Sequence, residues 1–205
     1  MNIKKFLLIL MTLVLVFSAS ACSSEGSSFV KQKSNTSEEE TLPPIPKQAF
    51  SSNKTNQNIS EKEMRQSLKT YLNTYDSIFK NGEKIRNEDN LTKKESKKLN
   101  KLTKLANEND DNFSKFIKNN DLPRGYKEGA LKTKNYITST NQFLNKINSH
   151  IQKLNKHSES DDVSLEDAKK LNKINDQYKK EVNGKKQNEV DKFLKNKDIK
   201  TKVFK

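Results

Sequence analysis

The sequence predicts an all-α fold, an antiparallel four-helix bundle of long amphipathic helices that follows a signal peptide and a disordered linker. Apolar residues recur at helical spacing from residue 60 onward, and no stretch alternates as a strand would. With 31% hydrophobic and 32% charged residues and no Trp, the composition suits long helices with narrow apolar stripes. An N-terminal apolar run followed by a polar stretch completes the pattern.

The first 21 residues have the order of a secretion signal. Two lysines precede an apolar run from Phe6 to Phe17, and small residues fill positions 18–21. The run and these small residues together are 16 residues long, shorter than the roughly 20 that a membrane-spanning helix needs. We therefore predict a signal peptide over residues 1–21 rather than a transmembrane anchor.

The only cysteine of the chain, Cys22, follows these small residues directly. The segment Ala19-Ser20-Ala21-Cys22 resembles a bacterial lipobox, although that motif usually carries Leu where this chain has Ala19. The resemblance implies a diacylglyceryl group on the Cys22 thiol and cleavage before Cys22. Two acyl chains attach a protein stably, whereas one gives marginal binding. We expect a lipid anchor at the extracellular face of the cell membrane; the alternative is an unmodified thiol.

Residues 22–59 are predicted to form the lipidated N-terminus and a disordered linker. They are rich in Ser, Asn, Gln, Thr and Lys, with Phe29 and Phe50 as the aromatic residues. Such a segment buries too little apolar area to offset the entropy of ordering it. As a flexible chain, the 37 residues after Cys22 would reach roughly 35 Å and space the domain from the membrane.

The first two predicted helices begin with matching capping signals. Ser60 with Glu63 starts the first helix, and Thr92 with Glu95 starts the second. A turn at residues 119–125 ends the second helix, because its proline disfavours helix at the residue before it. The apolar stripe of the second helix comprises Leu99, Leu102, Ala106, Phe113, Phe116 and Ile117.

Two further helices follow. The third is the longest, with an apolar stripe from Ala130 to Leu154. The fourth is capped by Ser164 with Asp167, and polar residues in its stripe predict a kink or break at Gly184. Four such helices with short connections favour one up-down-up-down bundle domain over residues 60–205.

The chain is strongly basic. Its net charge is +14, and loss of the two lysines in the signal peptide lowers it to +12. A basic exterior attracts anionic lipid, anionic wall polymer or nucleic acid, but an exported, tethered protein rarely meets nucleic acid, so we expect no such partner. A candidate basic face at helical spacing, opposite the second apolar stripe, comprises Lys93, Lys97, Lys101 and Lys104; its default interpretation is a solvated surface.

Helical geometry places Asn109 in the middle of the second apolar stripe and Asp110 at its edge. A buried amide without partners costs about 1–3 kcal/mol, and single buried Asn residues can set helix register. We therefore interpret Asn109, Asp110 and Phe113 as a structural feature, with a ligand-contacting polar cluster as the alternative.

The pentad Asn109-Asp110-Asp111-Asn112-Phe113 matches the NDxxF pattern after which a group of staphylococcal lipoproteins is named. The order of lipobox, polar linker and Lys/Asn-rich helical domain resembles that family too. In general form the chain is also similar to proposed cell-wall-binding lipoproteins of Gram-positive bacteria. The resemblance implies a surface lipoprotein and brings no established activity with it.

The sequence contains no catalytic or metal-binding motif that we identify. His150 and His157 lie on the solvent flank of the third helix without further ligands at fixed spacing, and Asp161 and Asp162 do not complete a site. The glycines of the helix breaks lack the second glycine of a phosphate loop. We therefore predict a non-enzymatic protein without cofactor or metal.

These observations predict a binding or structural module at the membrane–cell-wall interface of a Gram-positive bacterium. One candidate partner is an anionic wall polymer, bound through the basic face. The other is a protein, either a bacterial surface protein or a host factor, that docks on the bundle.

Overall fold

The computed structural model describes residues 42–86, 92–157 and 164–204. Within these residues the chain is all-α and its helices pack as a bundle, which confirms the predicted fold class. Extended pairing in this part of the chain is limited to one parallel bridge between Asn58 and Asp121. The helices described are α2 (Glu61–Arg86), α3 (Lys93–Lys118), α4 (Lys127–His157), α5 (Leu165–Tyr178) and α6 (Gly184–Asn196).

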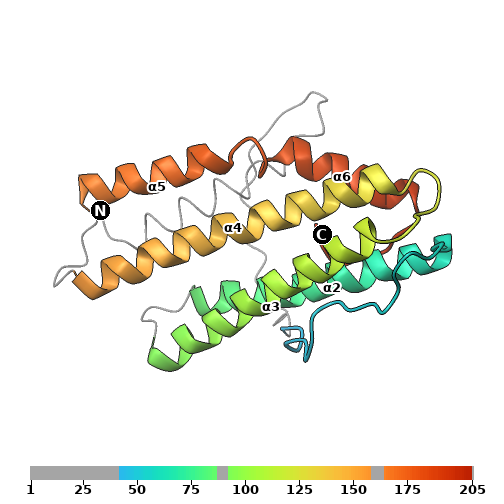
Figure 1. Cartoon of the computed structure of the whole chain (residues 1–205). Coiled ribbons are helices and arrows are strands. Elements are labelled where there is room, and N and C mark those ends of the chain that lie inside the picture. Colours follow the sequence, from blue (N-terminus) through green and yellow to red (C-terminus); the bar gives the residue numbers. More distant parts are fainter. Residues whose placement is uncertain (1–41, 87–91, 158–163, 205) are drawn as a thin grey trace, which may run out of the picture.

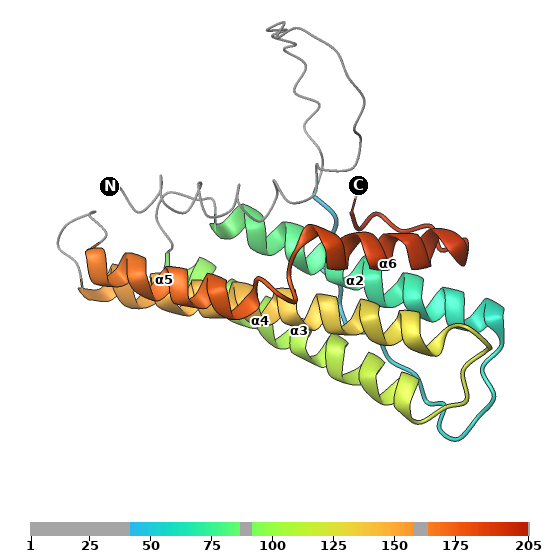
Figure 2. The same ribbon diagram turned by 90° about the horizontal axis from the view of Figure 1, so that it is seen from above.

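The chain reverses direction from α2 to α3, from α3 to α4 and from α4 to α5, as the up-down-up-down order requires (Figure 1). α2 packs on α3, and α3 packs on α4. α5 and α6 both pack on α4 and follow one another along the molecule (Figure 2). The fourth member of the bundle is therefore built from two short helices.

The break in this fourth member lies at the predicted position. α5 ends at Tyr178, and Asn183 caps α6 with extended backbone and a side-chain oxygen that accepts a hydrogen bond from Lys186 N at 3.0 Å. After Tyr178, the next buried apolar residue along the chain is Val190. The polar positions in between give the chain no apolar surface to bury, so a cap and a new helix replace a continuous one.

The capping signals of α3 and α5 are confirmed. Thr92 accepts a hydrogen bond from Glu95 N at 3.2 Å, and the Glu95 carboxylate accepts one from Thr92 N at 2.7 Å. Ser164 accepts a hydrogen bond from Asp167 N at 3.1 Å. Both caps satisfy amide groups that have no partner within their helix.

The first capping box forms only in part. Ser60 accepts a hydrogen bond from Glu63 N at 3.3 Å. The Glu63 carboxylate, however, pairs with Lys54 Nζ at 2.7 Å rather than turning back to the start of the helix. Lys54, in the segment before α2, thus competes with the start of the helix for the Glu63 carboxylate.

That segment corrects the predicted linker. We define the strap as residues 43–59; it lies along α2 and α3 (Figure 1, blue to cyan). Ala49, Phe50 and Ile59 are only 4–5% exposed. The prediction of disorder up to residue 59 is therefore wrong for the strap, because composition alone does not show that its backbone finds partners on α3. The packed domain begins before Ser60.

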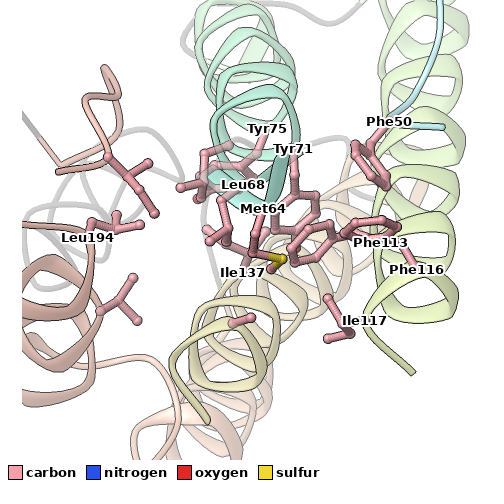
Figure 3. Close-up of a cluster of buried hydrophobic side chains, with 14 of the residues drawn as sticks. Phe50, Met64, Leu68, Tyr71, Tyr75, Phe113, Phe116, Ile117, Ile137 and Leu194 are labelled. Atoms are coloured by element: carbon pink, nitrogen blue, oxygen red, sulfur yellow. The ribbon is translucent and has the colours of Figure 1, made fainter. Parts of the chain in front are cut away.

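The apolar core is continuous at one end of the bundle and divided at the other. The main cluster joins the strap, α2, α3, α4 and α6 around Met64, Leu68, Phe113 and Ile137 (Figure 3). Toward the C-terminal end of α2, two separate clusters replace it. One lies between α2 and α3 and contains Ile78, Ile85, Leu99, Leu102 and Ala106; the other lies between α4 and α5 and contains Phe143, Ile147, Leu171 and Tyr178.

Gly129 allows α4 and α6 to approach closely. A Cβ built on Gly129 would clash with the ring of Phe193. That ring also packs edge-on against the fully buried Tyr126, with 6.1 Å between ring centroids. A methyl group at position 129 would therefore have to displace the Phe193 ring from its contact with Tyr126.

We predict that Gly129→Ala destabilises the protein by about 1–3 kcal/mol, the usual cost of overpacking a core, although alanine is the better helix former. The matched control is Gly82→Ala, where the new methyl group meets only the flexible Arg86 side chain at 2.9 Å. Urea unfolding of both variants measures the effect. Equal or higher stability of Gly129→Ala relative to Gly82→Ala would contradict the packing argument.

Candidate functional site

The pentad is buried in α3, as its place in the apolar stripe predicts. Asn109 is 1% exposed, Asp110 is 5% exposed and Phe113 is inaccessible to solvent. Asp111 is exposed and Asn112 is half-buried. The pentad therefore directs most of its side chains into the bundle, where each must find a partner.

Asn109 and Asn112 hold the backbone of the strap at Phe50. Phe50 N donates a hydrogen bond to Asn109 Oδ1 at 2.9 Å, and Asn112 Nδ2 donates one to Phe50 O at 2.9 Å. Asn109 Nδ2 also donates to the backbone oxygen of Tyr71 on α2, at 3.2 Å. The oxygen and the nitrogen of the buried Asn109 side-chain amide thus each have a hydrogen-bond partner, so burying it does not incur the cost of an unpaired polar group.

Asp110 connects α3 to two other helices. The Tyr71 hydroxyl of α2 donates a hydrogen bond to Asp110 Oδ1 at 2.7 Å, and Asn141 Nδ2 of α4 donates one to Oδ2 at 3.0 Å. Burial raises the pKa of Asp110, and the bonds from Asn141 and Tyr71 oppose this rise without cancelling it. Burial and the neighbouring Asp110 raise the pKa of Tyr71, so its hydroxyl remains a donor.

Phe113 anchors the aromatic part of the same site. Its ring stacks on Tyr71 with 4.2 Å between centroids and meets Phe50 edge-on at 5.3 Å (Figure 3). Offset stacked and edge-on pairs are favoured arrangements of aromatic rings. The contacts therefore support the structural interpretation of the pentad: it joins the strap, α2 and α4 to α3.

A second asparagine on α3's C-terminal side repeats the arrangement. Asn120 Nδ2 donates to Lys54 O at 3.0 Å, and Asn120 Oδ1 accepts from Gln57 N at 3.1 Å. Backbone bonds join Ile59 N to Asp121 O at 2.9 Å. The sequence predicts only a turn over residues 119–125, so the role of Asn120 emerges from the structure; the adjacent short amide side chains Asn119-Asn120 are the signal that could have indicated it.

We predict that Asn109→Ala releases the strap. Phe50 N would lose its acceptor in a buried position, which costs about 1–3 kcal/mol. Hydrogen exchange should accelerate at strap amides, and urea unfolding should show the loss of stability. Asn107→Ala, an exposed amide two residues away on α3, is the matched control; identical behaviour of the two variants would refute the role of Asn109.

The basic face lies on the solvent side of α3. Lys93, Lys97, Lys101 and Lys104 are all exposed, as helical spacing predicts. Lys94 and Lys98 are exposed beside them, and none of these six lysines forms an ion pair within the part of the chain that the structure describes. The acidic residue among them, Glu95, serves the cap.

The lysines of the basic face do not stabilise α3 electrostatically. Cations near a helix N-terminus oppose the helix dipole, and Lys93 and Lys94 occupy the first turn. Other lysines of the bundle have carboxylate partners, such as Lys132 with Glu128 at 2.9 Å and Lys195 with Asp191 at 2.6 Å. Exposed lysines without an ion pair in the described structure also occur on other helices, and the basic face differs from them in gathering six such lysines within residues 93–104 of one helix.

The histidine prediction needs a correction. His150 is not on the solvent flank: its side chain is 12% exposed, between α4 and α5, with Nε2 3.8 Å from Asp167 Oδ1. The side chain of His157 and the loop residues Asp161 and Asp162 lie outside the described structure, as does Cys22. Among the residues that the structure describes, no three metal-binding side chains converge.

Hollows on the described surface of the bundle include two that are lined by α3 and α4. A groove of about 500 Å³ lies between α3 and α4 and reaches Tyr178 of α5; most of the residues that line it carry polar groups, among them Asp110, Thr138 and Gln142. A smaller cavity of about 30 Å³ lies between α2, α3 and α4 beside the Arg86 guanidinium. Neither hollow presents a nucleophile beside a base, and their amides and hydroxyls suit hydrogen bonding to a polar group.

The chain matches no protein-family model, and comparison with curated proteins and with solved structures likewise found no match. In the described ranges, every helix is too short or too polar to cross a bilayer.

Proposed function

We propose that the protein is a lipid-anchored, non-catalytic binding module at the outer face of the membrane of a Gram-positive bacterium, and that its basic face binds a polyanion of the cell envelope. The observation that carries this proposal is the basic face. Its lysines are exposed, unpaired in the described structure and set at helical spacing on a firmly packed helix.

The orientation of α3 in the bundle is fixed by its apolar side. Leu99 and Leu102, on the opposite side of the helix, are 3–4% exposed and pack against α2. A buried apolar stripe fixes the rotation of the helix, so the lysines stay directed to solvent. An array of fixed cations attracts a polyanion more strongly than the same charges scattered over the surface.

The anchor rests on the lipobox resemblance of Ala19 to Cys22. We predict that Cys22→Ser moves the protein from the membrane fraction to the culture medium, because the acyl chains that hold it are lost. Mass spectrometry of the wild-type product should show a lipid-modified N-terminal cysteine. A wild-type chain with a free thiol, or an unchanged distribution of Cys22→Ser, would refute the anchor.

We also predict that replacing the four lysines of the basic face by Gln weakens binding to long-chain polyphosphate, a defined polyanion. The wild-type affinity should fall steeply between 50 and 300 mM salt, because the Debye length shortens from about 14 Å to about 6 Å over this range and screens the charges. Fluorescence anisotropy measures both effects. Binding that is insensitive to salt and to these substitutions would refute polyanion recognition by this face.

The groove between α3 and α4 favours a second candidate, a protein partner. The side-chain amides that line it, those of Asn107, Gln142 and Asn145, offer hydrogen-bonding groups to a partner's side chain. A partner recovered from surface extracts, and lost on substitution of Gln142 but not of the basic face, would favour this candidate.

A further inference from the structure

The strap determines where the anchored N-terminal segment joins the domain. Its first hydrogen bond to the bundle runs from Asn81 Nδ2 to Pro43 O, at 2.8 Å. Asn81 lies on α2 between Ile78 and Ile85, which pack with Leu99 and Leu102 of α3 in one cluster. The segment therefore meets the bundle at the level of the basic face.

Without the strap, the anchored segment would meet the domain at the opposite end. Ser60, directly before α2, lies 21 residues from Asn81, and 21 helical residues extend about 32 Å. The strap is held against α3 by Asn109, Asn112 and Asn120. It therefore shifts the point at which the N-terminal segment joins the bundle by this length along α2.

The strap also limits the reach of the anchor. Leu42 follows Cys22 by 20 residues, which span at most roughly 70 Å even when fully extended. The strap takes up the following 17 residues, 43–59, which would otherwise lengthen the tether. The strap thus shortens the tether, and the tether joins the bundle at the end that carries the basic face.

We propose, on the basis of the proposed function, that the polyanion bound by the basic face is the anionic phospholipid surface of the membrane that holds Cys22. A lysine near an anionic bilayer contributes about 1 kcal/mol, or roughly fivefold in affinity. Lipid chains and a polybasic patch together form a two-part membrane attachment. The strap brings the N-terminal segment to the bundle at the level of the basic face, so that the lipid anchor and the lysines can engage one bilayer together.

Vesicle binding tests this inference. The mature chain, residues 22–205 with Cys22→Ser, is mixed with vesicles of phosphatidylcholine alone or with phosphatidylglycerol. We expect binding only to the anionic vesicles and a loss of at least about tenfold when Lys93, Lys97, Lys101 and Lys104 become Gln. The matched control changes four exposed lysines on other helices to Gln: Lys62, Lys69, Lys127 and Lys192.

Equal losses in the two variants would overturn the inference, because net charge rather than the basic face would then drive binding. Absence of binding to anionic vesicles with polyphosphate binding intact would overturn the inference and leave the proposed function standing. Absence of both would refute the two together.

Lysine acetylation on the natively lipidated full protein tests the orientation. On anionic vesicles, Lys97 and Lys101 should be acetylated more slowly than on neutral vesicles, whereas Lys115 and Lys118 should react at the same rate on both. Asn109→Ala, which frees the strap, should reduce this protection. Uniform rates at all four lysines would overturn the proposed orientation.

Discussion

The hydrogen bonds that Asn109 makes in the interior of α3 hold together segments that are far apart in the sequence. One amide accepts from Phe50 N and donates to Tyr71 O, so the strap, α2 and α3 meet at a single side chain. Asp110 extends the same network to α4 through Asn141. A fully bonded polar layer specifies one arrangement of helices more strictly than apolar contacts do, because any shift leaves buried groups unpaired.

Much of the bundle follows from local sequence patterns. Helix number, caps and the break before Gly184 depend on residues within a turn or two of each other, and the periodic burial of Leu99, Leu102 and Phe113 follows from helical spacing. The inward position of Asn109 was predictable for the same reason. Its partners were not, because Phe50 lies 59 residues away.

The remaining features depend on long-range contacts that no local pattern contains. The strap resembles disordered chain in composition, yet Asn120 and Asn112 supply its backbone with partners. Gly129 reads as an ordinary helical glycine until Phe193 of α6 is placed against it. The exposure of the basic face followed from spacing, whereas its lack of ion pairs in the described structure depends on which acidic residues other helices bring near.

The divided core has a consequence for the dynamics of the molecule. At one end a single apolar cluster joins the strap and four helices, so no helix there can leave without exposing the others. At the other end the α4–α5 cluster shares no member with the α2–α3 cluster. Local opening of α5 would therefore expose only its own small cluster, and the strap and the polar network would stay intact. The molecule thus combines a half with one shared apolar core and a half in which two small apolar clusters are linked by polar contacts, such as the hydrogen bond that Thr103 Oγ1 donates to Asn145 Oδ1.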